Sequence, residues 1–246
     1  MHNIFLGGLQ GLAEFLPISS SGHLALAHRL LGLDADVLAR TVLFHVGTLA
    51  AVITFFFRDI GRYLRQRRLL GYMLVVTFLT SAVGLFLHES VKRLFSSPVW
   101  IGGFLFVNGV VLLATRRAEG PGRRGITLLD SVVMGCAQGL AVLPGISRSG
   151  MTIAVLLLRG CEPREAFRFS FIVSLPAVAA AFIFETATAD TAALLTDPSI
   201  YAGMATAYLL GLMTLYVLEG LLLMRRFYLF GFYCLALGAL AALVIR

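Results

Sequence analysis

Glu14, Ser20 and His23 are the side chains of this sequence whose types and spacing are best suited to chemistry, and they lie in the stretch EFLPISSSGH (14–23). A carboxylate and an imidazole can move protons, and a hydroxyl beside them can act as a nucleophile. The surrounding chain is strongly apolar, and a carboxylate inside a membrane costs about 2.5–3.5 kcal/mol on insertion scales. An acid in that position is a functional candidate by default, so this stretch predicts a catalytic site.

A second stretch repeats the first and adds a fixed positive charge. QGLAVLPGISRSGMT (138–152) aligns without a gap with QGLAEFLPISSSGHL (10–24) at an offset of 128, and eight of the fifteen positions are identical. Its Arg148 carries a planar guanidinium that matches phosphate oxygens. Helices that begin after the two breaks would also point free N–H groups at an anion. The two stretches therefore predict an oxyanion pocket with phosphate as its leading ligand, and its hydroxyl donors are Ser19, Ser20, Ser21, Ser147, Ser149 and Thr152.

Several of these residues have a structural alternative. Serines that follow a proline commonly cap a helix, so capping and ligand contact stay open for Ser19, Ser21, Ser147 and Ser149. Arg148 could anchor a helix end at the membrane surface, but its place inside the break favours the pocket. The other histidine in an apolar segment, His45, is expected to bond a backbone carbonyl.

The composition indicates an integral membrane protein. Apolar residues make up 59% of the 246 residues and charged residues 13%, whereas soluble domains carry about 25% charged residues. The net charge of +7 comes from basic residues in short clusters between apolar runs, so it predicts membrane topology and no nucleic-acid partner. The three cysteines show no C-x-x-C spacing, which argues against a disulfide framework or a thiolate metal site. The apolar N-terminal stretch lacks a basic region and contains Glu14 and Pro17, so we expect it to stay in the mature protein.

The positions of the apolar segments predict the fold. Two of them, 1–33 and 126–158, are interrupted by Pro, Gly and Ser and are expected to be broken helices. The arginine-rich connections are expected to face the cytoplasm. Six further segments are long enough to cross a bilayer, at 40–57, 69–87, 98–115, 168–184, 201–223 and 227–245.

The repeated stretch implies an internal repeat of the whole fold. One broken segment and three spans occur twice, and an odd number of crossings in each unit inverts the second copy relative to the first. We therefore predict an all-α polytopic membrane protein, 1–246, with an inverted-topology repeat of units 1–118 and 126–246. Each unit contains one broken, re-entrant helical segment and three transmembrane helices. In this architecture the breaks meet near the middle of the membrane and form a shared site.

The two stretches resemble the signatures of the undecaprenyl-diphosphate phosphatase family, the bacitracin-resistance phosphatases of the bacterial membrane. The first signature corresponds here to Gln10, Glu14 and the run from Pro17 to His23, and the second to the run from Pro144 to Thr152. The resemblance covers essentially the whole chain. It implies an enzyme that hydrolyses undecaprenyl (C55 polyprenyl) diphosphate to undecaprenyl phosphate and inorganic phosphate, recycling the lipid carrier for cell-wall synthesis. A polyprenyl-phosphate flippase is the alternative.

The resemblance also implies roles for individual residues. Glu14 would be a catalytic carboxylate that also holds a divalent cation, Mg²⁺ or Ca²⁺, and Arg148 would clamp the diphosphate. Ser147 and Thr152 would bind substrate, and Ser20 or His23 would be the nucleophile or the proton-transfer partner. Gln10 stands where the family pattern allows a second carboxylate, which implies a weaker metal contact because Mg²⁺ prefers carboxylate oxygens. A homodimer and a site that opens to the outer face of the bacterial cell membrane are expected on the same basis.

Overall fold

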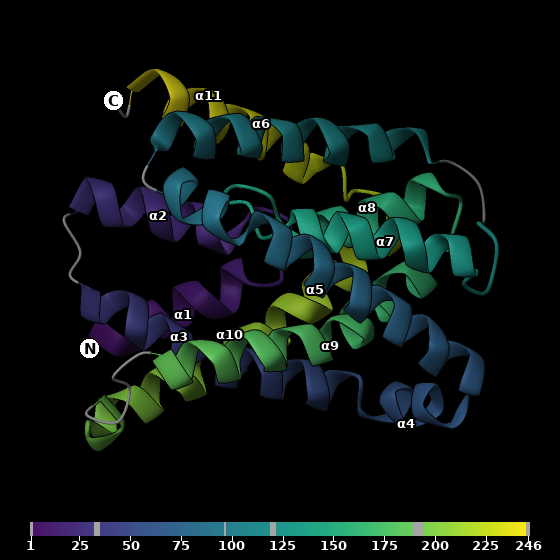
Figure 1. Ribbon diagram of the computed structural model, residues 1–246, viewed down its shortest axis with the longest axis horizontal. Coiled ribbons are helices and arrows are strands. Elements are labelled where there is room, and N and C mark those ends of the chain that lie inside the picture. Colours follow the sequence, from purple (N-terminus) through teal and green to yellow (C-terminus); the bar gives the residue numbers. More distant parts are fainter. Residues whose placement is uncertain (1, 32–34, 96, 119–121, 189–193, 245–246) are drawn as a thin grey trace.

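The computed structural model of the protein describes residues 2–31, 35–95, 97–118, 122–188 and 194–244. The expected ranges 1–33 and 227–245 each include a few residues outside this set. Over the residues covered, the chain is helical, and its only β-type pairing is an isolated bridge between Arg123 and Cys161. The helices, labelled in Figure 1, are α1 His2–Ala13, α2 Ser20–Leu31, α3 Ala35–Phe55, α4 Phe57–Arg65, α5 Arg67–Phe95, α6 Pro98–Ala114, η1 Thr115–Arg117, α7 Leu128–Leu140, α8 Arg148–Leu158, α9 Pro163–Thr188, η2 Leu194–Thr196, α10 Pro198–Leu223 and α11 Leu229–Val244.

Both broken segments were predicted correctly, and proline explains each break. Helix α1 ends at Ala13 before Pro17, and α7 ends at Leu140 before Pro144. A proline ring removes a backbone donor and clashes with the preceding turn, so neither helix continues through it. The chain reverses within six or seven residues and starts α2 and α8, so each segment is a pair of short helices joined by a tight turn.

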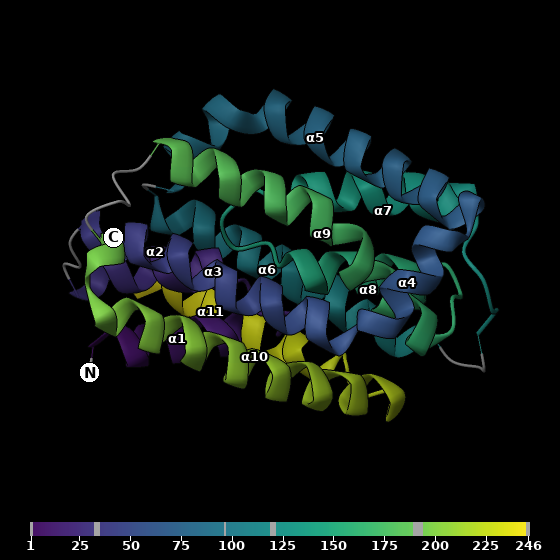
Figure 2. The same ribbon diagram turned by 90° about the horizontal axis from the view of Figure 1, so that it is seen from below.

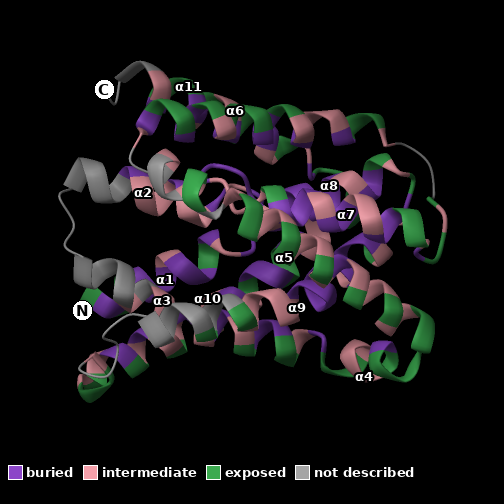
Figure 3. Ribbon diagram, in the orientation of Figure 1, coloured by how far each residue is buried: buried purple, intermediate pink, exposed green. Residues whose placement is uncertain are grey.

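The helices pack as layers that enclose the two breaks. Helix α1 lies against α10, and α10 also packs against α3, while α5 lies along α7 and α6 pairs with α11. Figure 1 shows α6 and α11 side by side at the upper edge, and Figure 2 shows α5 at the periphery of the bundle. The buried residues concentrate on α7, α8 and the part of α9 beside them (Figure 3). The breaks therefore lie in the interior, where irregular backbone is tolerated in a membrane protein.

The predicted spans agree with the structure in part. Within the described residues, three helices are long and apolar enough to cross a membrane, at Arg67–Leu87, Pro98–Arg117 and Pro198–Leu223. The segment expected at 40–57 qualifies only as a bent pair, because Val42–Phe55 and Phe57–Arg65 meet at 72°. The expected spans 168–184 and 227–245 fall in α9 and α11, which do not reach these limits of length and apolarity over the described residues. The structure thus supports a polytopic membrane protein with fewer full-length spans than the sequence predicts.

The outward surface of α5 agrees with a lipid environment. Leu74, Phe78, Leu85 and Phe86 are 62–87% exposed along one helix. A contiguous apolar patch of this kind is rare on a soluble monomer. The same exposure costs little in hydrocarbon, so α5 faces lipid.

An aromatic cluster holds the end of the first break in place. Phe15, directly after Glu14, is 1% exposed and meets Phe171 of α9 edge to face at 5.6 Å between ring centroids. Phe171 also contacts Phe56 and Phe167, at 5.9 and 5.1 Å. Aromatic pairs of this geometry contribute about 0.5–1.5 kcal/mol each beyond burial. The cluster therefore fixes the position of the backbone from which the Glu14 side chain extends.

Candidate active site

The two breaks contact each other directly through their serines. Ser19 Oγ accepts hydrogen bonds from the backbone N–H of Gly22 in its own break and of Gly145 in the other, both at 3.2 Å. Gly145 has a φ of +105° and little free space around its Cα, because an added Cβ would lie 2.5 Å from the Ile101 carbonyl oxygen. Glycine is the residue that combines this backbone conformation with such close approach. The contact brings segments 126 residues apart into one site.

Asn108 of α6 ties the two breaks together from behind. Its Nδ2 donates to the Pro17 carbonyl oxygen at 3.0 Å, and its Oδ1 accepts from the Ser147 N–H at 3.1 Å. The side chain is fully buried, so both bonds replace solvation that the backbone groups have lost. Sequence reasoning missed this residue, although a lone asparagine in an otherwise apolar span was a usable signal.

Ser147 and Ser19 cap the N-termini of α8 and α2, so for these two residues the structure supports the capping alternative. Ser147 is the N-cap of α8, and its Oγ accepts from the Gly150 N–H at 3.1 Å. Ser19 precedes α2 with a φ of +68°, a left-handed conformation that costs a non-glycine residue free energy. Both residues also line the pocket described below, so capping does not prevent a polar ligand from approaching them.

Glu14 is the centre of the polar cluster. Its Oε2 accepts from Gln10 Nε2 and from Ser20 Oγ, each at 3.0 Å, and its Oε1 accepts from Arg148 Nη2 at 2.7 Å. The Glu14 side chain is 10% exposed and that of Arg148 is 21% exposed. A charged carboxylate can be accommodated at such a buried position when it is paired with a cation and hydrogen-bonded. The structure therefore brings Gln10, Glu14, Ser20 and Arg148 together, as their predicted roles require.

A small cavity of about 190 Å³ opens beside this cluster. Its volume is several times the roughly 30 Å³ that one water molecule occupies in the liquid. Its lining is mostly polar, and a carboxylate, hydroxyls and a guanidinium lie around the same space. The lining residues are Glu14, Ser19, Ser20, Ser21, His45, Ala141, Ile146, Ser147 and Arg148.

His45 also belongs to this cluster, which was not predicted from the sequence. Its Nε2 lies 3.1 Å from Gln10 Nε2 and 3.6 Å from Glu14 Oε2, and its side chain is 28% exposed. Its Nε2 thus faces side chains of the site. The signal that could have identified it was its place in an apolar segment, where an ionisable residue is a functional candidate.

His23 lies near the break but faces away from Glu14. Its Nδ1 is 2.8 Å from the Ser19 carbonyl oxygen, and its Nε2 is 2.6 Å from the hydroxyl of Tyr233 on α11. The two rings are stacked, with centroids 5.6 Å apart. His23 is absent from the lining of the cavity, so the structure does not bring it together with Glu14 and Ser20.

Thr152 and Ser149 form the support behind Arg148. Thr152 Oγ1 lies 2.8 Å from the Arg148 carbonyl oxygen and 2.5 Å from Ser170 Oγ on α9, and the residue is 1% exposed. Ser149 Oγ lies 3.2 Å from Ser147 Oγ. Neither residue lines the cavity. They hold the first turn of α8 against its neighbours and so orient Arg148.

The sequence of this chain is similar to that of known proteins over nearly its full length. Residues 3–240 match the family described as bacitracin resistance protein BacA. An undecaprenyl-diphosphatase of Syntrophotalea carbinolica is 38% identical over 254 residues, which cover 98% of this chain and 97% of that protein. Proteins of the same name from Treponema denticola and Thermotoga petrophila are each 36% identical, with 96% and 98% of this chain covered and 93% and 99% of theirs. A match of this extent establishes kinship over nearly the full length, so the chain belongs to the bacitracin resistance protein BacA family.

Proposed function

We propose that this chain is an integral membrane phosphatase that hydrolyses undecaprenyl diphosphate to undecaprenyl phosphate and inorganic phosphate. The observation that carries the proposal is the hydrogen bond from Ser20 Oγ to Glu14 Oε2, with Arg148 on the other carboxylate oxygen. A hydroxyl bonded to a base is the arrangement that activates a nucleophile. The relatives named undecaprenyl-diphosphatase support the choice of substrate.

In the proposed reaction, Ser20 Oγ attacks the terminal phosphorus and Glu14 accepts the hydroxyl proton. The bond from this phosphorus to the bridging oxygen breaks, and its electron pair leaves with the polyprenyl monophosphate. Water then attacks the phosphoserine: Glu14 gives its proton to the departing Ser20 Oγ, takes the proton that the water loses, and releases this proton with the inorganic phosphate. Inorganic phosphate leaves and the side chains return to their starting state. The orientation of His23 toward Tyr233 favours Ser20 over His23 as the nucleophile.

Arg148 and the break serines would bind the diphosphate. A guanidinium can place two N–H groups on phosphate oxygens, and charge-assisted hydrogen bonds are the strong ones. The hydroxyls of Ser20 and Ser21 line the same cavity. Phosphoryl transfer depends mainly on positioning and on stabilising the charge of the transferring group, which these donors can supply. The isoprenoid would stay in lipid, because only the head group needs the polar cavity.

The residues present also fit a divalent cation. Gln10 Oε1 is a buried acceptor with no hydrogen-bond partner in the described part of the chain. It belongs to the side chain whose Nε2 donates to Glu14, so a 180° flip of this amide would turn its oxygen toward the carboxylate. Hard cations take oxygen ligands of this kind, and we propose that Glu14 and Gln10 hold Mg²⁺ or Ca²⁺. The bound cation would neutralise charge on the diphosphate oxygens.

We also propose that the fold is an inverted repeat with units 1–118 and 126–246. If α1 corresponds to α7, α5 to α10 and α6 to α11, exchange of the units converts the α1–α10 pair into the α7–α5 pair and leaves α6–α11 unchanged. In Figure 1, α1 and α2 lie toward the end of the bundle that carries the N label, and α7 and α8 toward the opposite end. Opposed broken segments are what an inverted repeat requires.

The remaining proposals concern location. The arginine-rich segments would face the cytoplasm of a bacterial cell, and the site would open to the outer face of its cell membrane. This orientation rests on the positive-inside rule. A homodimer is proposed from the family resemblance alone, and cross-linking in native membranes tests it.

The test of the proposed function is phosphate release from undecaprenyl diphosphate by purified protein in detergent, with Mg²⁺, with Ca²⁺ and with a chelator. We expect release that requires a divalent cation, and its loss in Arg148→Ala with retained helical circular dichroism. Arg148→Lys is the matched control, because it keeps the charge but loses the planar fork. Lipid binding that depends on Arg148 without any release of phosphate would instead support the flippase alternative.

A further inference from the structure

Helix α4 is a short amphipathic helix that leaves the membrane helix before it at a steep angle. The axes of α3 and α4 differ by 72° at Phe56. Arg58, Arg62 and Arg65 follow each other at i, i+4 and i+7, so they share one face of α4. Phe57 and Leu64 lie on another face, where they are 72% and 56% exposed. A helix with a basic face and an apolar face that turns away from a span is suited to the membrane surface.

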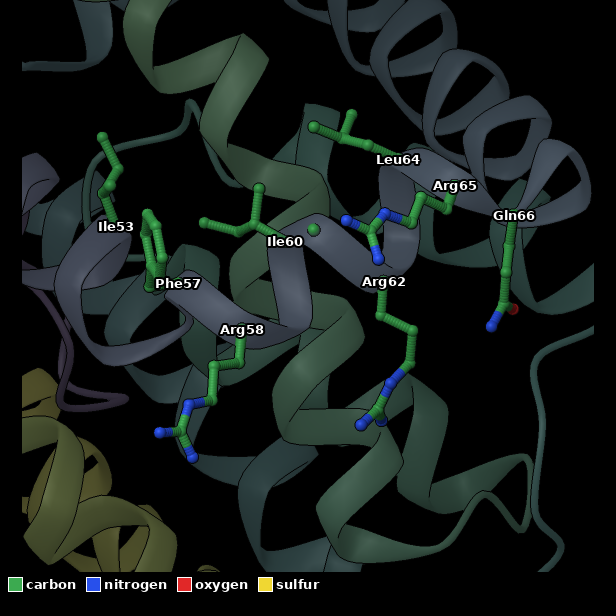
Figure 4. Close-up of a pocket in the computed structure, with 9 residues that line it drawn as sticks. Ile53, Phe57, Arg58, Ile60, Arg62, Leu64, Arg65 and Gln66 are labelled. Carbon is green, nitrogen blue, oxygen red and sulfur yellow. The ribbon is translucent and has the colours of Figure 1, made fainter.

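A groove of about 810 Å³ runs along this helix. Figure 4 shows Arg58 and Arg62 on one side of α4, Ile60 and Leu64 on the other, and Arg65 between Leu64 and Arg62. Gly61 lies between the two faces, and a Cβ added there would meet no atom within 4 Å. The groove is therefore open at its middle, with positive charge along one wall and hydrocarbon along the other.

The positive charge in the groove is poorly compensated. The side chains of Arg58 and Arg65 form no hydrogen bond or ion pair with the residues that the structure describes. Arg62 lies 3.4 Å from Asp59, but that carboxylate is shared with Arg168 of α9 at 3.5 Å. The Asp59 carboxylate is thus shared by two of these four arginines, and the side chains of Arg58 and Arg65 have no carboxylate partner among the described residues. Such a surface attracts an anion, and its salt dependence should be strong.

We propose that the α4 groove binds an anionic phospholipid, with the headgroup phosphate on Arg58, Arg62 and Arg65 and the acyl chains along Ile53, Phe57 and Leu64. The apolar wall distinguishes this ligand from a free phosphate ion, which would gain nothing from it. The wall continues from α3, a helix whose preceding turns are apolar, so acyl chains of the adjacent leaflet are within reach. Juxtamembrane arginines attract anionic lipid by roughly fivefold each.

The site is separate from the Glu14 cavity, since the two share no lining residue. Its ligand is a lipid of the surrounding bilayer that is held and not hydrolysed. The expected consequence is that α4 is fixed at the membrane surface by specific lipid.

The experiment uses a tryptophan placed at the groove. Phe57→Trp in a Trp100→Phe background gives a single reporter, because the chain has one tryptophan. The protein is reconstituted in phosphatidylcholine vesicles, and quenching by brominated phosphatidylglycerol is compared with quenching by brominated phosphatidylcholine. We expect phosphatidylglycerol to bind at least about tenfold more tightly at low salt.

Two kinds of variant distinguish lipid binding in the groove from attraction of lipid to the surface charge in general. Arg58→Gln with Arg65→Gln should remove most of this preference. Gly61→Leu should also remove it without changing charge, because the leucine occupies the groove. Arg116→Gln with Arg117→Gln removes the same charge at another arginine-rich segment and should change the preference less than about twofold. Helical circular dichroism checks folding of each variant.

Equal quenching by the two lipids would overturn the proposal. So would an equal effect of the Arg116/Arg117 control, since that result would mean attraction to the whole surface. Displacement of the brominated phosphatidylglycerol by inorganic phosphate at millimolar concentration would also refute it, because the site would then bind a free anion.

Discussion

Replacing Glu14 by glutamine changes the hydrogen bonding of the site while keeping the size of the side chain. The carboxylate receives three donors: Gln10 Nε2 and Ser20 Oγ on Oε2, and Arg148 Nη2 on Oε1. An amide has one oxygen and one NH₂ group. If the NH₂ faced Arg148, two donors would be opposed at 2.7 Å, so the amide oxygen should turn toward Arg148. The NH₂ group then faces Ser20 and Gln10, so the Ser20 hydroxyl must accept instead of donate and the Gln10 amide must turn its oxygen toward the new donor.

The rate should therefore fall for two reasons that act on the same step. The base is lost, and the Ser20 proton no longer points to an acceptor. Loss of a general base costs about 10²–10⁴-fold in rate. Because the Arg148 contact survives as a bond to a neutral oxygen, the free energy of unfolding should fall by only about 1–2 kcal/mol. The variant should fold and bind substrate but release phosphate slowly.

The assay is a double-mutant cycle of Glu14→Gln and Ser20→Ala, measured as phosphate release from undecaprenyl diphosphate. If the two side chains act as one unit, the double variant should be no slower than the slower single variant, within about threefold. Thermal unfolding of each protein supplies the control for folding. A combined loss equal to the product of the single losses would refute the proposed pairing, and so would Glu14→Gln activity above about a tenth of the original.

Three further changes test the site and the packing that holds it. Ser147→Ala removes the N-cap of α8, so thermal unfolding should show a loss of about 1 kcal/mol in the free energy of unfolding. Ser147→Gly should cost only about a few tenths of a kcal/mol. Equal losses would contradict the capping role. Gly102→Ala places a Cβ 2.7 Å from a carbonyl oxygen of α11 and should lower the free energy of unfolding by about 1–3 kcal/mol. At the adjacent Gly103, an added Cβ meets no atom within 4 Å, so Gly103→Ala should be neutral in the same measurement. His45→Ala should lower kcat/KM about tenfold, because its Nε2 lies close to the Glu14 carboxylate; an unchanged value would remove His45 from the site.

The sequence alone determined the membrane class, the two broken segments and most of the polar cluster, because these depend on local properties. Hydropathy follows from composition, and Pro17 and Pro144 interrupt a helix wherever it packs. Glu14 and Ser20 are six residues apart across a tight turn, so local geometry brings them together. The match between residues 10–24 and 138–152 also predicted that Arg148 would face the first break.

The tertiary structure decided which further side chains reach the site. His23 and His45 are alike in sequence context, but the direction of each depends on how its helix is rotated against neighbours far away in the chain. Contact with α11 turns His23 to Tyr233, while α3 presents His45 to Gln10 and Glu14. Asn108 is 91 residues from its partner Pro17. The bend of 72° between α3 and α4 likewise converts an expected loop into an amphipathic helix. Helix rotation and bending depend on many packing contacts between distant parts of the chain, so they cannot be predicted from any single stretch of sequence.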